Sequence, residues 1–196
     1  MSHYREKADQ FLRTVSFVTG NHYKAREVAQ VLGAVRHIDV DLPEIQELDP
    51  RKVVLAKAKA AVERGYSPVL VDDTSMSLSG MNGLPGPLIK WFLKALGAEG
   101  MYRLAAHAND FRAEVRTIFG LAMGPQTILY GEASIAGEIV IPRGGDFGWD
   151  AIFQPGGGTK TLGEMTAEEK QAISIRRDAL LDLRNQLERF HSVYKR

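Results

Sequence analysis

The stretch from Thr14 to Leu32 constrains the fold of this chain strongly, because it turns from a strand pattern into a helix pattern within a few residues. The apolar run TVSFVT is typical of a strand, and the spacing at 24–32 is typical of a helix that stops at Gly33. The same alternation continues along the chain and predicts an α/β fold. Further strands are expected at 35–42, 68–73, 113–123 and 127–141, and further helices at 50–64, 88–96 and 167–190, the last one broken near Ser174.

Length and composition indicate one ordinary globular unit. The 196 residues are 44% apolar and 25% charged, so we predict a single α/β domain across 1–196, with 1–13 as a polar N-terminal extension that carries a helical turn. The net charge of +1 argues against a protein that coats nucleic acid. The sequence has no cysteine, no apolar run near the roughly 20 residues that span a bilayer, and no apolar signal core at its start. We therefore expect a cytoplasmic protein that contacts neither nucleic acid nor membrane.

The corner Thr19-Gly20-Asn21 joins the first strand to the first helix, and Lys24 follows one turn later. A helix N-terminus carries N–H groups without intrahelical partners and a partial positive charge, which together attract anions. Glycine lets the backbone approach a ligand closely, and the Lys24 ammonium is suited to a phosphate. A second interpretation stays open, in which Asn21 is only an N-cap and Lys24 is a solvated surface residue. The spacing of a P-loop is absent.

Acidic residues follow two of the predicted strands. Asp72 and Asp73 end the buried run VLVDD, and Glu44 lies on the loop DLPE after the second strand. Ligands of open α/β sheets collect beyond the carboxyl ends of strands, and alternation sends neighbouring side chains to opposite faces. Oxygen ligands without His or Cys suit Mg²⁺ shared with phosphates, with Mn²⁺ as a substitute. The alternative is that these acids only cap turns or helices.

The segment GGDFGWD combines two aromatic residues with two acids around a glycine. An aromatic face beside a hydrogen-bond acceptor suits a nucleoside, which makes Phe147, Trp149 and Asp150 candidates for a base site. In the alternative interpretation the segment is a hairpin whose aromatic side chains belong to the core. The late helix adds Lys170 and Arg176, although basic residues on such a helix are usually solvated.

Several motifs follow one another in a set order: TGN-x-x-K at 19–24, DLPE at 41–44, LV-acid-DT at 70–74, GLPGP-x-IKWF at 83–92, FGWD at 147–150, and a lysine four residues before Ser-x-Arg at 170–176. In this order and spacing the chain resembles the inosine triphosphate pyrophosphatase family, over about 14–187. The resemblance implies hydrolysis of non-standard purine nucleoside triphosphates (ITP, dITP, XTP) to the monophosphate and pyrophosphate, which removes them from the nucleotide pool. It also implies Mg²⁺ as cofactor, a homodimer, and an elongated mixed sheet flanked by helices, with two lobes and a substrate cleft between them.

The resemblance implies a role for each matching residue. Asp73 corresponds to the catalytic position, the base assigned to the attacking water, and it shares the metal with Glu44. Because a metal-bound carboxylate has a low pKa and is a weak base, we expect Asp73 to orient the water. Substrate contacts are implied for Thr19, Gly20, Asn21, His22, Tyr23, Lys24, Lys57 and Thr74 near the triphosphate, and for Phe147, Gly148, Trp149, Asp150, Lys170, Ile175 and Arg176 near the nucleoside.

One position departs from the family pattern. The usual Ser-His-Arg is here Ser174-Ile175-Arg176, so a base-site histidine that can donate to a 6-keto oxygen is missing. A hydrogen-bonding site rejects analogues better than an apolar one, so we expect weaker discrimination against ATP or pyrimidine nucleotides. Alternatively, Ile175 only packs against the base and Arg176 suffices. Two other functions remain as alternatives: a non-catalytic nucleotide-binding module, against which Glu44 and Asp73 argue, and a strand-binding protein, against which the net charge argues.

Overall fold

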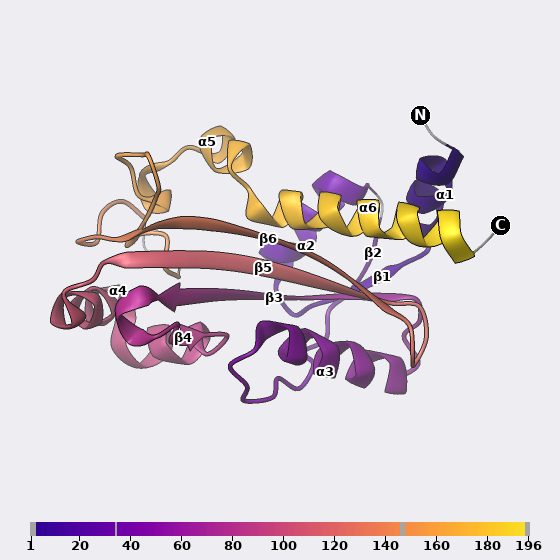
Figure 1. The fold of residues 1–196 in the computed structure, drawn as a ribbon, viewed down its shortest axis with the longest axis horizontal. Coiled ribbons are helices and arrows are strands. Elements are labelled where there is room, and N and C mark those ends of the chain that lie inside the picture. The colour runs from indigo at the N-terminus through magenta and orange to yellow at the C-terminus, as the bar shows by residue number, and fades with distance from the viewer. Residues whose placement is uncertain (1–2, 34, 146–147, 195–196) are drawn as a thin grey trace.

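The computed structural model describes residues 3–33, 35–145 and 148–194. Its described strands form one mixed sheet of seven strands with helices on both faces (Figure 1). The strands are β1 Ser16–Val18, β2 Arg36–Ile38, β3 Val69–Leu78, β4 Pro85–Gly86, β5 Arg112–Ala122, β6 Ile128–Ile139 and β7 Phe153–Pro155. The helices are α1 His3–Leu12, α2 His22–Leu32, α3 Pro50–Glu63, α4 Ile89–Ala108, α5 Ala167–Ala172 and α6 Ile175–Tyr194, with short 3-10 turns at Ser79–Met81 and Leu162–Glu164.

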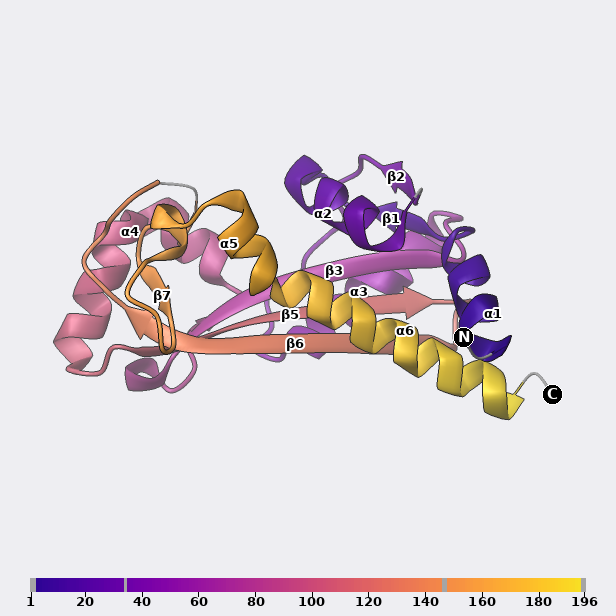
Figure 2. The ribbon, with the colours of Figure 1, turned by 90° about the horizontal axis from the view of Figure 1, so that it is seen from above.

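The strand order is β2-β1-β3-β5-β6-β7, and β4 pairs with β3 outside this path. β1 runs parallel to β2 and β3, whereas β3, β5, β6 and β7 pair antiparallel in sequence order. The three long strands β3, β5 and β6 extend along the length of the molecule (Figures 1 and 2). The predicted α/β class and the elongated mixed sheet are therefore confirmed.

The prediction that β3 ends at the acid pair is wrong. β3 continues for five residues beyond Asp73, because it pairs with β5 along its whole length, from Val69↔Ala122 to Leu78↔Ala113. By contrast, the parallel pairing between β1 and β3 stops at Phe17↔Leu70. The acids thus lie in the middle of their own strand but just beyond the carboxyl end of the neighbouring strand β1.

Two helices differ from expectation, and one prediction about a helix is confirmed. Residues 1–13 were expected to carry only a helical turn, but α1 is a ten-residue helix whose Ala8 and Leu12 are buried in a core cluster shared with α6. α4 is longer than the predicted 88–96, and Gly97 interrupts its helical geometry with a φ of 66°. The expected break before Ser174 is present, since α5 ends at Ala172 and α6 begins at Ile175.

The sheet is packed closely between α6 on one face and α3 on the other (Figure 1). Glycines on adjacent strands permit this approach. A Cβ added to Gly131 of β6 would lie 2.4 Å from the Ala179 carbonyl oxygen and the Leu183 nitrogen of α6. A Cβ added to Gly120 of β5 would lie 2.5 Å from Val54 of α3. The backbone atoms of α6 near Gly131 and the Val54 side chain near Gly120 leave no room for a larger residue, so these glycines permit the close packing of helix and sheet.

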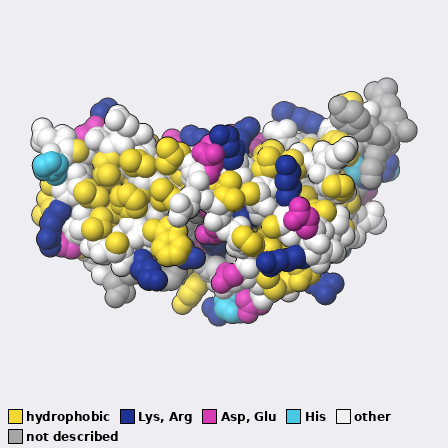
Figure 3. All heavy atoms as spheres, turned by 90° about the horizontal axis from the view of Figure 1, so that it is seen from below, with side chains coloured by type: hydrophobic (Ala, Val, Ile, Leu, Met, Phe, Trp, Pro, Cys, Tyr) yellow, Lys and Arg dark blue, Asp and Glu magenta, His cyan; other side chains and the backbone are white. Residues whose placement is uncertain are grey.

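The two ends of the long strands carry different elements (Figure 2). One end holds α1, α2, β1 and β2, and the other holds α4 and β7. Figure 3 shows hydrophobic side chains gathered over the α4 end, with a hollow flanked by acidic and basic side chains between the two ends. Among the described helices, none combines the length and the hydrophobicity that crossing a membrane requires.

Candidate active site

The corner between β1 and α2 has the geometry of a capped helix. The Asn21 side chain accepts hydrogen bonds from the backbone nitrogens of Tyr23 at 3.0 Å and Lys24 at 3.2 Å. The Thr19 hydroxyl in turn accepts from the Asn21 nitrogen at 3.1 Å. Asn21 is therefore an N-cap, as the second interpretation of this stretch held. Several of the N–H groups that we expected to be free for an anion already have partners within the corner.

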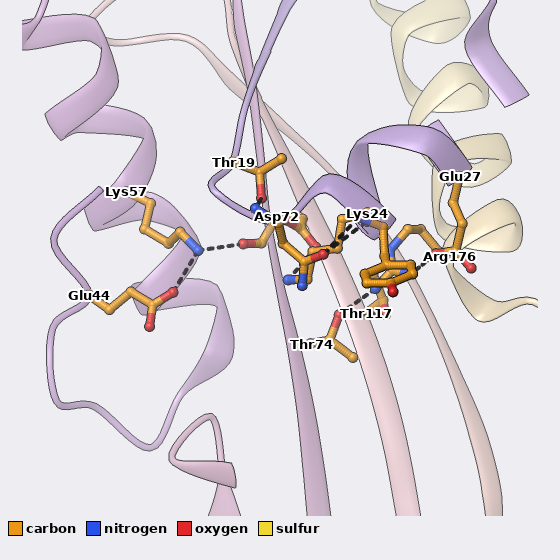
Figure 4. A network of polar contacts seen from close by, with 11 residues as sticks. Thr19, Lys24, Glu27, Glu44, Lys57, Asp72, Thr74, Thr117 and Arg176 are labelled. Atoms are coloured by element: carbon orange, nitrogen blue, oxygen red, sulfur yellow. Dashed lines mark hydrogen bonds and ion pairs between the residues drawn. The ribbon is translucent and has the colours of Figure 1, made fainter. Parts of the chain in front are cut away.

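The part of the second interpretation that makes Lys24 a solvated surface residue is wrong. Its ammonium lies 2.8 Å from the Asp72 Oδ2 atom of β3 (Figure 4), and the carboxyl side chain is only 2% exposed. Because β1 is short, α2 begins beside the open edge of β3 at the level of the acid pair. The first turn of the helix can therefore reach this carboxylate. His22 and Tyr23, which precede Lys24, have exposed side chains.

Lys57 of α3 reaches the same region from the other side of β3 (Figure 4). Its ammonium donates to the Asp72 main-chain oxygen at 2.8 Å and to Glu44 Oε1 at 3.0 Å. Burial would lower the pKa of Lys57, but Asp72, Glu44 and Asp73 together hold it above its ordinary value. Burial likewise opposes ionisation of Glu44, and the attraction of Lys57 nevertheless leaves the pKa of Glu44 lowered. Both groups are therefore charged at neutral pH.

Asp73 is a buried carboxyl with an unsatisfied oxygen. Its exposed fraction is 8%, and its Oδ2 atom has no hydrogen-bond partner among the described residues. Burial raises the pKa of Asp73 to about 6, and the lysines Lys57 and Lys24 only partly offset this effect. The neighbouring carboxylates Asp72 and Glu44 raise it further. The ammonium groups of Lys24, Lys57 and Lys90 all act on these carboxylates, and the Asp73 Oδ2 atom is still without a hydrogen-bond partner among the described residues.

These features fit a divalent cation. A buried carboxylate oxygen without a hydrogen-bond partner is a group that a bound metal would satisfy. Asp73 and Glu44 are the residues that would hold it, both through oxygen. The described residues contain no group of three or more His, Cys, Asp or Glu side chains arranged around one point. A site with two carboxylates is typical of Mg²⁺, which keeps waters and shares its coordination with substrate phosphates.

Arg176, the second residue of α6, lies on the opposite side of Asp72 from Lys57 (Figure 4). Its guanidinium forms an ion pair with Glu27 of α2, and its Nη2 atom donates to the Thr74 hydroxyl at 3.4 Å. The Thr74 hydroxyl also lies 3.1 Å from that of Thr117 on β5. Burial lowers the pKa of Arg176 to about 10, so the guanidinium remains charged at neutral pH.

The residues predicted for the nucleoside form a neighbouring group. Lys170 of α5 forms an ion pair with Asp150 at 2.6 Å, which ties the FGWD segment to the helix. Trp149 and Ile175 are partly buried and pack against the same core cluster. Ile175 is followed directly by Arg176, so the residues predicted for the nucleoside adjoin the contacts of Arg176 with Thr74 and Glu27. Gly148 is exposed with a φ of 62°, and Phe147 lies outside the described residues.

Sequence reasoning did not assign roles to two side chains that complete the cluster. Asp72 was considered as a turn cap, whereas it is the partner of Lys24. Glu27 was not considered, although it lies three residues after Lys24 and so on the same side of α2. That spacing was the available signal, but nothing in it pointed to Arg176, which is 149 residues away. Two surface cavities, of about 310 and 670 Å³, include none of the predicted site residues.

Fold and charged cluster together define a mixed-sheet α/β protein with a lysine- and acid-lined site at the start of a helix. Comparison with known proteins gives its family. The model of the Ham1 family matches residues 15–186, and the chain belongs to this family.

The similar proteins cover nearly the whole chain. The inosine triphosphate pyrophosphatase of Schizosaccharomyces pombe is 43% identical in an alignment of 182 positions that covers 90% of this chain and 96% of that protein. The solved structure of a HAM1 protein from Coxiella burnetii has the same fold, with a TM-score of 0.77 at 24% identity over 90% of this chain and 98% of that one. A dITP/XTP pyrophosphatase structure from Mycobacterium abscessus has a TM-score of 0.70 at 26% identity, covering 87% and 98% of the two chains.

Proposed function

We propose that this protein hydrolyses non-standard purine nucleoside triphosphates (ITP, dITP and XTP) to the nucleoside monophosphate and pyrophosphate. It is thus a hydrolase that acts on phosphoric anhydrides. The observation that carries the proposal is the convergence of Lys24 and Lys57 on the buried acid pair Asp72-Asp73. The identity of 43% with an inosine triphosphate pyrophosphatase supports the same activity.

The triphosphate binds at the corner Thr19–Lys24 and near Lys57. Lys24 and Lys57 are already held in place by Asp72 and Glu44, so little side-chain entropy is lost when they meet a phosphate. Phosphoryl transfer depends mainly on positioning and on stabilisation of developing negative charge. Two oriented ammonium groups provide both. Thr74, which is held by Arg176 and Thr117, lies on the side of the nucleoside.

Glu44 and Asp73 would hold Mg²⁺, or Mn²⁺ as a substitute, near the phosphates. The metal supplies positive charge that offsets the negative charge developing on the phosphates. Asp73 is the catalytic residue, and its free Oδ2 atom is the acceptor that would orient the attacking water. Burial favours the protonated carboxyl, and a nearby cation favours the carboxylate that this role requires.

The nucleoside binds between Trp149 and the start of α6. Trp149 offers an aromatic face, Asp150 and Lys170 form a fixed polar pair, and Arg176 is the charged donor that remains in place of the missing histidine. Phe147 and Gly148 complete the predicted set, and Ile175 packs beside the base. We propose that Arg176 provides the contact to the 6-keto oxygen.

The alternatives from the sequence are not favoured. The similarity to an inosine triphosphate pyrophosphatase over 90% of the chain favours the proposed activity over a relaxed-specificity enzyme or a non-catalytic module. A strand-binding protein would need a basic surface that a net charge of +1 does not supply. We further propose that the chain acts as one domain across 1–196, that it forms a homodimer, and that it works in the cytoplasm.

A pyrophosphate-release assay tests the proposed function. The substrates are ITP, dITP, XTP, dUTP and the four standard nucleoside triphosphates, each with Mg²⁺. We expect pyrophosphate and monophosphate from ITP, dITP and XTP, with kcat/KM at least about a hundredfold above that for ATP. Release of single phosphates instead of pyrophosphate, or equal rates with all purines, would contradict the proposal.

A further inference from the structure

The main chain at Thr19 is held to β2 from two directions. Its N–H donates to the Ile38 carbonyl at 3.1 Å, as a parallel strand pair requires. Its carbonyl oxygen lies 2.8 Å from the Nε2 atom of the His37 side chain. A carbonyl can only accept a hydrogen bond, so Nε2 carries the proton. β2 ends at Ile38, and the Val40 N–H turns back to the Ile38 oxygen. The His37 imidazole thus donates to the Thr19 carbonyl in place of a backbone N–H of β2.

This hydrogen bond determines the orientation of the next peptide group. The Thr19–Gly20 bond is trans, so its C=O and N–H groups point in opposite directions. With the carbonyl directed to His37 on β2, the Gly20 N–H is directed away from β2. Because Gly20 lies at the corner, this N–H belongs to the backbone that precedes the N-cap Asn21.

Glycine makes the orientation vulnerable. A peptide group rotates most readily where a neighbouring residue tolerates both signs of φ, and Gly20 is such a residue. Rotation of the Thr19–Gly20 peptide would replace an N–H by a carbonyl oxygen at a corner that must accept negative charge. A carbonyl oxygen repels phosphate, whereas an N–H binds it.

We propose that His37 is a positioning residue for the triphosphate: it holds the Thr19–Gly20 peptide so that the Gly20 N–H faces the phosphates. The proposal rests on the proposed function, because it assumes a phosphate at this corner. His37 itself lies on β2 and acts through Thr19. Nothing in the sequence marks it, since it is an exposed histidine in a short strand.

Arg36 is a matched control for His37. It lies next to His37 on β2, its side chain is also exposed, and it belongs to no part of the proposed site. A general effect of substitutions on the exposed part of β2 would appear at both positions, whereas the peptide orientation responds to His37 alone.

The experiment compares His37→Leu, His37→Gln and Arg36→Met with the wild type. Leucine removes the donor, whereas the glutamine side-chain nitrogen reaches about as far as Nε2 and keeps it. The inhibition constant and calorimetric Kd for inorganic pyrophosphate report on phosphate binding without a base, and ITP hydrolysis gives KM and kcat. The melting temperature of each variant shows whether the fold is intact.

We expect His37→Leu to weaken pyrophosphate binding and raise KM for ITP by about fivefold, with a smaller change in kcat and a nearly unchanged Tm. His37→Gln should recover most of the binding, and Arg36→Met should bind as the wild type does. Unchanged binding in His37→Leu, a loss that glutamine does not reverse, or an equal loss in Arg36→Met would overturn the proposal. If the wild type binds pyrophosphate but hydrolyses no triphosphate, the proposed function fails, and the binding comparison still decides the role of His37.

Discussion

Lys24 of α2 and Asp72 of β3 form an ion pair at 2.8 Å that joins the first helix to the central strand. The lysine that the sequence predicted for a phosphate is therefore not a free surface residue, because a carboxylate that is 2% exposed pairs with it. Lys57 is held in the same way by Glu44 and by the Asp72 main chain. The site thus has its cations in place before any substrate arrives, a form of preorganisation that favours phosphoryl transfer.

Substitution of Lys24 should affect both the stability of the fold and the kinetics of hydrolysis. Lys24→Met leaves a buried carboxylate without its partner, so we expect the free energy of unfolding to fall by about 3 kcal/mol. KM for ITP should rise and kcat should fall together, because phosphate charge grows toward the transition state. Urea unfolding and steady-state kinetics measure the two effects.

The double variant Lys24→Met/Asp72→Asn distinguishes the two roles. Removing the acid should restore much of the lost stability but none of the activity, since the ammonium is still absent. If the double variant regained wild-type kcat/KM, Lys24 would serve only the fold.

Asp73 should lower the stability of the metal-free protein at neutral pH. Its folded-state pKa of about 6 exceeds the ordinary value of 3.8, so the native protein holds this proton more tightly than the unfolded chain does. The contribution of this group is therefore most favourable below pH 4 and declines as the pH rises from about 4 to about 6, by roughly 3 kcal/mol in total. In EDTA, Asp73→Asn should remove this decline and be more stable than the wild type at pH 7.5.

Urea unfolding in EDTA at pH 5 and pH 7.5 measures this difference. Asp110→Asn is the control, because hydrogen bonds from Arg112 hold the pKa of Asp110 at about 2 and its contribution changes only at lower pH. The stability of the wild type relative to Asp73→Asn should therefore fall between pH 5 and pH 7.5. If it does not fall, Asp73 is already ionised in the metal-free fold.

Mg²⁺ should reverse the instability caused by Asp73. We expect Mg²⁺ to raise the Tm of the wild type, because a ligand that binds only the native state stabilises it, and to leave the Tm of Asp73→Asn nearly unchanged. Glu44→Gln should show a reduced shift. Turnover should be lost in EDTA and should fall at least about a hundredfold in Asp73→Asn. Near-normal turnover in EDTA is incompatible with the metal site.

The preference for ITP over ATP should depend on Glu27, which holds Arg176, more than on Ile175, the position that the sequence suggested. The Arg176 guanidinium is held between Glu27 and Thr74, so its direction is set without a histidine at 175. We expect the wild type to prefer ITP over ATP by at least about a hundredfold in kcat/KM. Ile175→His should change this ratio by less than about tenfold, and Glu27→Gln should reduce it by more. A large gain in Ile175→His would restore the hypothesis of relaxed specificity.

The sequence alone determined the class of fold and the order of its elements. Apolar periodicity and helix-stop residues placed α2, α3, the β5–β6 pair and the break before α6, because these signals are local. It also indicated the family through the order of several short motifs. Local signals failed at β3, where the acid pair resembled a strand end. Pairing with β5 carries the strand past it, and that pairing joins residues far apart in the chain.

Only the tertiary structure decided how the candidate site is connected. Thr19, Lys24, Glu44, Lys57 and Asp73 were all expected from the sequence, but the partners Asp72, Glu27 and His37 were not assigned roles. Each partner is brought in by contacts between separate elements: α2 against β3, α2 against α6, and the end of β1 against β2. Burial is decided in the same way: the raised pKa of Asp73 reflects first the packing that buries it, and the adjacent Asp72 adds a smaller effect. Sequence patterns specify which side chains are available, and packing determines which of them meet.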